Sequence, residues 1–164
     1  IVERISSVIY LSVGTFHKGF DRLVEPFDNF CRINKIKCIA QIGGGDYLPS
    51  YIKYEREFTL SKHLANIKKS SLVITHGGYG NILDLIHVKK SFIVFPRNSN
   101  EAGHDQKKSI KNLAKKMNIT ACYTQKNLED KILKFIIKKN INIIKLPKSN
   151  IPNIIKNFIN KNFL

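Results

Sequence analysis

Residues 71–84 hold the combination of side chains and glycines that is best suited to chemistry in this chain. A β-branched apolar run ends in Thr75 and His76, two glycines follow, and an apolar-periodic segment then carries Asp84. This order predicts a buried strand, a tight turn and the start of a helix. Such a turn aims free backbone N–H groups and the positive end of a helix dipole at one point, which suits a phosphate. The segment therefore indicates a protein that binds a nucleotide or another phosphorylated compound.

Several further residues could contribute to the same chemistry. Asp84 lies about two turns after His76, where its carboxylate could accept hydrogen bonds from a ribose diol. Asp105 and Gln106 open a later helix and offer acceptors and donors for sugar hydroxyls, although acidic residues are also common at helix starts. His17 follows an earlier glycine corner and could be a phosphate contact, a general base or an ordinary loop residue. The alternatives are that His76 caps a helix without binding a ligand and that Asp84 is a solvated helix residue.

The elements that must position these residues alternate between strands and helices. Apolar runs predict strands at 8–13, 36–42, 72–75, 91–95 and 119–123, with a short strand at 57–59. Helical periodicity predicts helices at 20–34, 62–69 with Ser61 as N-cap, 79–88, 104–117 and 128–138. Strands that are apolar on both faces and alternate with helices predict an α/β fold with a parallel sheet covered on both sides. Glycine corners at 14–15, 43–45 and 76–78 follow three of these strands, so we expect one shared crevice beyond their carboxyl ends.

Composition limits the class of protein and its partners. The 164 residues suffice for one domain with a substantial core, and 28 basic against 12 acidic residues give a net charge of +16. Such a charge suits nucleic acid, an anionic membrane or a phosphorylated substrate, or reflects a general preference for lysine. Few aromatic residues lie among the basic ones, which disfavours nucleic acid. The isolated cysteines Cys31, Cys38 and Cys122 are expected to be buried thiols in a reducing cytosol rather than disulfides or metal ligands.

Two regions differ in character along the chain. Residues 1–139 are expected to form the ligand-binding domain, whereas 140–164 form a basic, amphipathic tail interrupted by Pro147 and Pro152. This tail is expected to pack on the domain or to contact a partner protein or membrane. No apolar run approaches the roughly 20 residues that span a bilayer, and the start of the chain lacks the long apolar segment of a secretory signal.

Four groups of residues together resemble a known family: 13–15 with 20–23, 75–81 with Asp84, 93–97, and Glu101 with 104–106. They resemble the donor-binding half of GT-B glycosyltransferases, specifically the glycosyltransferase family 28 C-terminal domain, over about residues 8–137. Within that family the chain is most similar to the stand-alone catalytic subunits of two-component bacterial capsule and exopolysaccharide glycosyltransferases. Those subunits are similar in turn to the catalytic subunit of the eukaryotic dolichol-linked N-acetylglucosamine transferase. The resemblance implies a Rossmann-like parallel sheet with helices on both faces, a single C-terminal half of a GT-B fold.

The resemblance also implies roles for individual residues. The backbone around Gly14 would face the phosphates, His76 with the amides of 77–78 would hold the diphosphate, and Asp84 would hold the ribose in place of the more usual glutamate. Uracil would lie near 58–60, held mainly by backbone groups. The donor sugar would lie near 105–106, where the order His-Asp-Gln departs from the related Asp-His-Gln or Asn-His-Gln loops. The expected catalytic residues are His76 and His17. The expected substrate-binding residues are Gly14, Thr15, Gly43, Thr59, His76, Gly77, Gly78, Asn81, Asp84, Glu101, Asp105 and Gln106.

The function implied is transfer of a hexose or N-acetylhexosamine from a UDP-sugar to a lipid-linked acceptor. The sequence contains no Asp-x-Asp motif, and the resemblance implies catalysis without a metal or other cofactor. It also implies a separate membrane-anchored subunit that binds the acceptor and holds this chain in the cytoplasm at the inner face of the cell membrane. The general base is not evident in this sequence, and the partner subunit could supply it. Two alternatives remain: a non-enzymatic nucleotide-binding or regulatory module, and, with less support, a basic nucleic-acid-binding protein.

Overall fold

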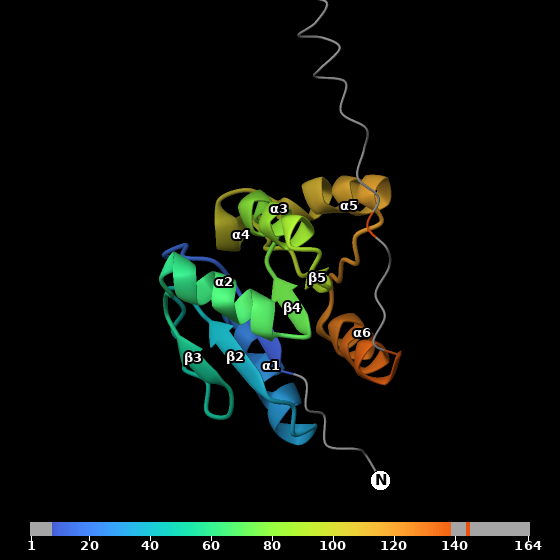
Figure 1. Cartoon of the computed structure of the whole chain (residues 1–164). Helices are drawn as coiled ribbons and strands as arrows, with labels where there is room; N and C mark the ends of the chain where they lie inside the picture. Colours follow the sequence, from blue (N-terminus) through green and yellow to red (C-terminus); the bar gives the residue numbers. More distant parts are fainter. Residues whose placement is uncertain (1–7, 139–143, 145–164) are drawn as a thin grey trace, which may run out of the picture.

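The chain forms a five-stranded parallel sheet in the computed structural model, which describes residues 8–138 and 144 (Figure 1). The strand order is β3-β2-β1-β4-β5. The strands are β1 (Ile9–Ser12), β2 (Cys38–Gln41), β3 (Lys53–Glu55), β4 (Leu72–Thr75) and β5 (Phe92–Val94). The expected α/β fold with a parallel sheet is confirmed.

The register of the central strands places their carboxyl ends level with one another. Ser12, the last residue of β1, pairs with Gln41 of β2 on one side and with Thr75 of β4 on the other. The pairing continues for one residue beyond the strands, since the amide of Val13 donates to the carbonyl of Gln41 and the amide of His76 donates to the carbonyl of Ser12. The chain therefore leaves three adjacent strands at the same edge of the sheet.

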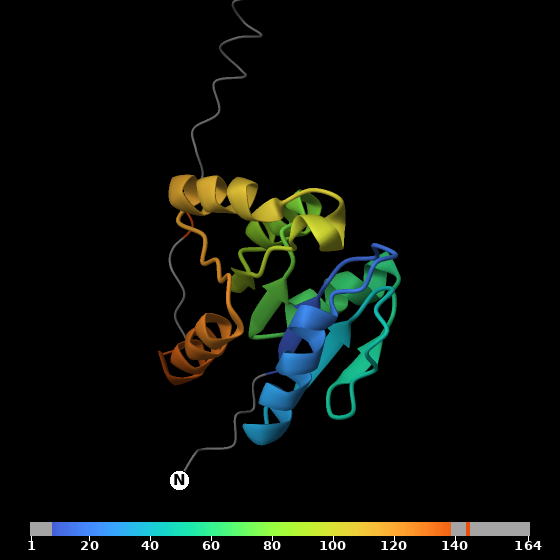
Figure 2. The same ribbon diagram turned by 180° about the vertical axis from the view of Figure 1, so that it is seen from behind.

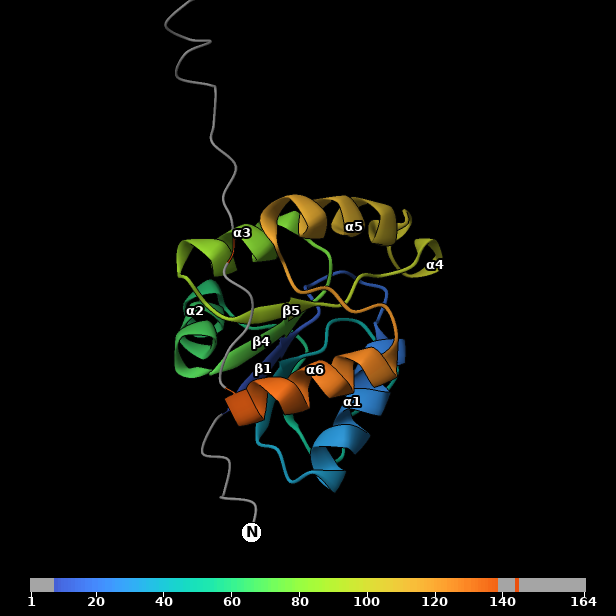
Figure 3. The same ribbon diagram turned by 90° about the vertical axis from the view of Figure 1, so that its right-hand side faces the viewer.

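Helices cover both faces of the sheet, as Figures 1 to 3 show from three sides. Helices α1 (Asp21–Ile33) and α6 (Gln125–Lys138) pack with Ile9 and Leu11 of β1 on one face. On the other face Tyr10 of β1 packs among residues from three helices, which are α2 (Leu60–Lys69), α3 (Tyr79–His87) and α5 (Gln106–Met117). Alternate side chains of a strand point to opposite faces, so β1 contributes to both layers of the core.

Two strand predictions need correction. The short strand expected at 57–59 is wrong, because the third strand is β3 (Lys53–Glu55), within a segment for which no element was predicted. This strand lies at the sheet edge with all three side chains exposed, so it carries no apolar pattern to reveal it. The strand expected at 119–123 is reduced to a single parallel bridge between Ala121 and Val94.

Helix starts differ from the predictions by about two residues. Helix α2 is capped by Thr59, whose hydroxyl accepts from the amide of Lys62, rather than by Ser61. Helix α5 begins at Gln106 rather than at 104, with Asp105 as N-cap. The segment before it, for which no element was predicted, contains the single-turn helix α4 (Ser99–Ala102). Each correction moves a candidate ligand residue into a capping position, where its side chain has a structural partner.

The three cysteines are buried free thiols, as the sequence predicted. The expected tail at 140–164 lies outside the described residues, apart from Ile144, which packs against the core cluster around Tyr10 and Val73. The division into 1–139 and 140–164 therefore stays a prediction. In the part of the chain that the structure describes, no helix combines the length and apolar character needed to cross a membrane.

Candidate functional site

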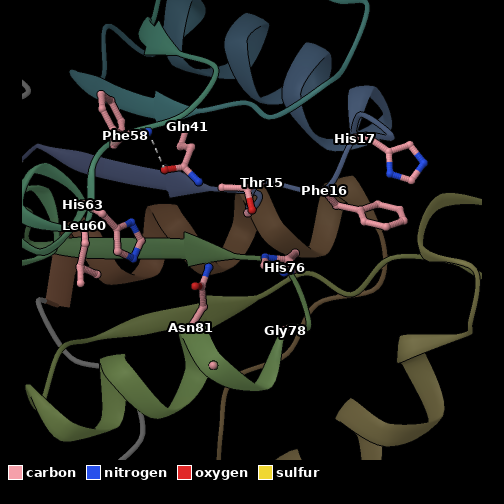
Figure 4. Close-up of a pocket in the computed structure, with 12 residues that line it drawn as sticks. Thr15, Phe16, His17, Gln41, Phe58, Leu60, His63, His76, Gly78 and Asn81 are labelled. Atoms are coloured by element: carbon pink, nitrogen blue, oxygen red, sulfur yellow. Dashed lines mark hydrogen bonds between the residues drawn. The ribbon is translucent and has the colours of Figure 1, made fainter.

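A cavity of about 720 Å³ opens at the edge where β1, β2 and β4 end (Figure 4). It is lined by segments that leave these strands and by the starts of α2 and α3. The lining residues are Gly14, Thr15, Phe16, His17, Gln41, Phe58, Leu60, His63, His76, Gly78, Gly80 and Asn81. Two of the three predicted glycine corners, at Gly14 and at 76–78, thus share one crevice. The volume falls in the range of small-molecule and cofactor sites.

The ring of His76 is held between two glycines. A Cβ atom at Gly14 would lie 2.8 Å from Cε1 of His76, and one at Gly78 would lie 2.4 Å from its Nε2. Both distances are shorter than carbon and nitrogen atoms tolerate, so only glycine leaves room for the imidazole at these positions. Gly14 also has a φ of +79°, which any other residue would adopt with strain. The two glycine corners therefore fix the position of His76.

His76 is neutral at pH 7. Burial lowers its pKa from 6.5 to about 4, the positive charge of Arg97 adds to that effect, and the Ser12 backbone opposes it more weakly. Its Nδ1 atom is buried and has no hydrogen-bond partner among the described residues. A neutral imidazole still carries one N–H donor, and an anion beside the ring would favour its protonated form. The site is thus suited to respond to a negatively charged ligand.

The start of helix α3 supplies backbone donors to the same cavity. Gly78 is the N-cap with no side-chain capping hydrogen bond, and its carbonyl accepts the amide of Ile82. The amides of Tyr79, Gly80 and Asn81 belong to the first helical turn, which leaves them without intrahelical acceptors. Together with the helix dipole they favour an anion at this point.

Arg97 is a structural residue behind this site that the sequence analysis gave no role. Its side chain is 1% exposed, and its guanidinium donates to the carbonyls of Val13, Lys18 and Gly19 at 2.9, 3.1 and 2.7 Å. It also lies over the ring of Phe20, 4.5 Å from the centroid. Arg97 thus fixes the loop between β1 and α1 and places a positive charge near His76. The sequence signal that could have pointed to this role is a basic residue directly after an apolar strand and a proline.

Gln106 and Gly77 are paired with each other. The Oε1 atom of Gln106 accepts from the amide of Gly77 at 3.1 Å and from the amide of Arg97 at 3.0 Å. The Gly77 amide that the resemblance assigned to the diphosphate is therefore already bonded in this structure. Gln106 is buried, and it links the start of α5 to the turns that follow β4 and β5.

Other predicted ligand residues lie outside the cavity lining. The carboxylate of Glu101 forms a two-point ion pair with Arg22, at 2.7 and 2.9 Å, and accepts from the amide of Asn98. Asp105 is exposed and accepts from the amide of Lys107. Thr59 caps α2, Asp84 is exposed on α3, and Gly43 is a buried turn residue whose carbonyl accepts from Arg56. Of the predicted set, the cavity collects Gly14, Thr15, His17, His76, Gly78 and Asn81.

Two polar lining residues were not anticipated as ligand residues. Gln41 ends β2, and His63 lies one turn into α2. His63 follows the N-cap Thr59 by four residues, so it lies in the first turn of α2. That placement depends on the cap position, which the sequence analysis set two residues too late.

A parallel α/β sheet with a histidine, a glycine turn and a helix N-terminus at its carboxyl edge defines a domain suited to an anionic ligand of nucleotide size. The chain belongs to the glycosyltransferase family 28 C-terminal domain, whose sequence model matches residues 9–158. This domain is the sugar-donor-binding half of the GT-B fold.

The solved structures give the same fold. The crystal structure of the glycosyltransferase SnogD from Streptomyces nogalater matches 85% of this chain with a TM-score of 0.52 and 15% sequence identity. The chain corresponds to 38% of the length of that glycosyltransferase. A comparison with curated proteins found no match.

Proposed function

We propose that this chain is the donor-binding, catalytic subunit of a two-component glycosyltransferase. It would move a hexose or N-acetylhexosamine from a UDP-sugar to a lipid-linked acceptor in capsule or exopolysaccharide synthesis. The observation that carries the proposal is the imidazole of His76, held between Gly14 and Gly78 beside the open first turn of α3. Family membership supports nucleotide-sugar binding. The two-component arrangement, the acceptor and the pathway rest on the sequence resemblance.

The geometry suits stabilisation of a leaving diphosphate. During transfer, the bond between the anomeric carbon and the diphosphate oxygen breaks while the acceptor oxygen bonds to that carbon and loses its proton to a base. Negative charge then builds on the diphosphate. The first-turn amides of α3 and the N–H of His76 would donate to it, and the buried charge of Arg97 would add a favourable potential. Because these groups are fixed before the reaction, little reorganisation is required.

The base and the role of metals are parts of this proposal. His17 is exposed in the loop after β1, where its ring packs 4.4 Å from that of Phe16, and it remains a candidate catalytic residue. We assign the general base to the acceptor-binding subunit. Within the described residues, no three His, Cys, Asp or Glu side chains are grouped closely enough to hold a metal ion. In the proposed reaction the amides and His76 stabilise the negative charge of the leaving diphosphate, which a divalent cation does in metal-dependent enzymes.

The partner and location follow from the same assignment. The described residues form one donor half, so an acceptor-binding half is needed for transfer, and we propose that a membrane-anchored subunit provides it. The chain would then act in the cytoplasm at the inner face of the membrane. A net charge of +16 supports this, because basic residues are attracted to anionic lipid.

A transfer assay tests the proposal. Labelled UDP-sugars are incubated with the purified chain, with membranes that contain the co-expressed partner, and with both, and label in the lipid fraction is counted. We expect UDP binding by the chain alone but substantial transfer only with both components. Full transfer by the isolated chain would refute the two-component arrangement. If calorimetry finds no UDP binding even with the partner present, the chain is better described as a regulatory module.

A further inference from the structure

The end of the cavity away from His76 is formed by residues with a different character (Figure 4). Phe58 and Leu60 provide apolar walls, while His63 and Gln41 provide polar groups. The ring of Phe58 packs 6.2 Å from that of Tyr10, which holds it against the core. Apolar walls with a few fixed polar groups are typical of small-molecule pockets, in which the polar groups set orientation and specificity. The inference drawn from this end rests on the proposed function.

A hydrogen bond with Tyr10 fixes the orientation of the His63 ring. The Tyr10 hydroxyl lies 2.8 Å from Nδ1 of His63, and the two rings meet edge to face at 5.6 Å. Tyr10 is fully buried, and burial raises the pKa of its phenol, so the hydroxyl keeps its proton. A phenol is the stronger donor of the pair and an unprotonated imidazole nitrogen the stronger acceptor. We therefore assign the hydrogen bond as donated by Tyr10 to Nδ1.

This assignment determines what His63 presents to the cavity. Burial lowers the pKa of His63, with Asp84 acting in the opposite direction, so the ring is neutral at pH 7. A neutral imidazole that accepts at Nδ1 carries its proton on Nε2. Figure 4 shows the ring facing the space bounded by Gln41 and Asn81. His63 thus presents a single N–H donor and no acceptor.

Gln41 has its orientation fixed in a similar way. Its Oε1 atom accepts from the amide of Phe58 at 3.2 Å, so turning the carboxamide over would set two donors against each other. Its amide nitrogen therefore points away from Phe58, toward Thr15 (Figure 4). This end of the cavity presents N–H donors from two fixed side chains.

N–H donors between apolar walls complement a heterocycle with carbonyl oxygens on its edge. Uracil has a carbonyl oxygen at C4, where cytosine has an amino group that is itself a donor. We propose that His63, held in one tautomer by Tyr10, donates from Nε2 to the O4 atom of uracil and selects uridine over cytidine nucleotides. A cytosine amino group at the same place would leave two donors facing each other, and neither could be satisfied.

Calorimetric titrations with UDP and CDP test this selection. We expect the wild-type chain to prefer UDP. We expect His63→Ala to weaken UDP binding about tenfold, the value of one well-placed hydrogen bond, while CDP binding changes little. Tyr10→Phe keeps the imidazole but frees its tautomer, so the preference should fall by about threefold. The matched control is His87→Ala, since His87 is exposed near the end of α3 and does not line the cavity.

The outcomes separate this inference from the proposed function. Equal affinity of the wild-type chain for UDP and CDP, or an equal loss of both in His63→Ala, would overturn the role of His63 while leaving nucleotide binding intact. Absence of binding to either nucleotide would refute the proposed function as well. NMR of the imidazole nitrogens gives a second test that uses only the wild-type chain and does not depend on the folding of a variant. The wild-type chain should show His63 with its proton on Nε2 at pH 7, and a proton on Nδ1 would overturn the inference.

Discussion

His76 combines burial, which disfavours its charged form, with a position beside a cavity suited to an anion. Its pKa of about 4 lies below the 6.5 of an exposed histidine. Between these values the unfolded chain binds a proton that the folded chain does not, so the free energy of unfolding falls as the pH falls. From pH 7 to pH 4.5 we expect this residue to account for a loss of roughly 2 to 3 kcal/mol.

Urea denaturation of the wild-type chain and of His76→Gln at both pH values measures this loss. The variant should lose less stability on acidification than the wild type, and the difference is attributable to position 76. His87→Gln, at an exposed position, should match the wild type. Equal acid sensitivity of the wild type and His76→Gln would show that His76 is not held neutral by the fold.

The glycines around His76 allow a second test at the residue scale. In Gly78→Ala the new methyl group would lie 2.4 Å from Nε2 of His76, so we expect a loss of stability of about 1 to 3 kcal/mol. A Cβ at Gly80 would meet no atom within 4 Å, and Gly80→Ala should instead stabilise the helix by up to roughly 1 kcal/mol. Thermal unfolding of the two variants is the comparison. Similar changes in both would mean that the ring of His76 is not confined by Gly78.

Arg97 ties the segment after β5 to the loop between β1 and α1, and substitution of its side chain tests this link. Lysine at this position keeps the charge but cannot reach the carbonyls of Val13, Lys18 and Gly19 together. We expect Arg97→Lys to lower stability by about 2 kcal/mol or more, because the buried carbonyl of Val13 and the partly buried carbonyls of Lys18 and Gly19 lose their donors, and to weaken UDP binding through the loop after β1. Arg32→Lys, at an exposed position on α1, should stay within about 0.5 kcal/mol of the wild type. Unchanged stability in Arg97→Lys would show that the hydrogen bonds of the Arg97 guanidinium do not hold the loop between β1 and α1.

Elements with a complete local signal were predictable from the sequence. The bounds of β4 (Leu72–Thr75) and the start of α3 were predicted to the residue, because an apolar run there meets two glycines. Strand β3 was missed because an exposed edge strand needs no apolar side chains, and its identity depends on pairing with β2. A sequence pattern shows which residues of a segment are buried. An exposed edge strand has no such pattern and is recognised only by its hydrogen bonds to the adjacent strand.

The difference between local patterns and long-range partners also explains which site residues were predicted correctly. Gly14 and His76 belong to corners that leave adjacent strands, so the topology alone brings them together. Glu101 was predicted as a ligand because of its place in a motif, but its ion pair with Arg22, 79 residues away, occupies its carboxylate. His63 was passed over because its tautomer is set by Tyr10, 53 residues earlier. Long-range partners decide which polar side chains remain available to a ligand.

Charge distribution is a property of the whole molecule. Helix α5 carries five lysines and no acidic residue, and in the described chain ion pairs involve only Arg22 with Glu101 and Lys62 with Glu55. These lysines therefore remain available to an anionic surface. Each lysine near such a membrane contributes about 1 kcal/mol. Helix α5 is the described element in which this effect is most concentrated.

We expect the chain to co-sediment with anionic vesicles at low salt and to be released at high salt. Replacing the exposed lysines Lys108, Lys111 and Lys115 by glutamine should weaken vesicle binding by about 100-fold. Vesicles of neutral lipid serve as the control and should not bind the chain. If anionic vesicles fail to sediment the chain at low salt, the basic residues do not serve membrane contact.

We propose that His76 and the start of α3 together bind the diphosphate of a nucleotide sugar. Titration calorimetry of a UDP-sugar into the wild-type chain and into His76→Ala tests it most directly. We expect measurable binding by the wild type and an affinity at least about tenfold lower for the variant, since a hydrogen bond to a charged group is lost. Equal affinities of the two proteins would contradict it.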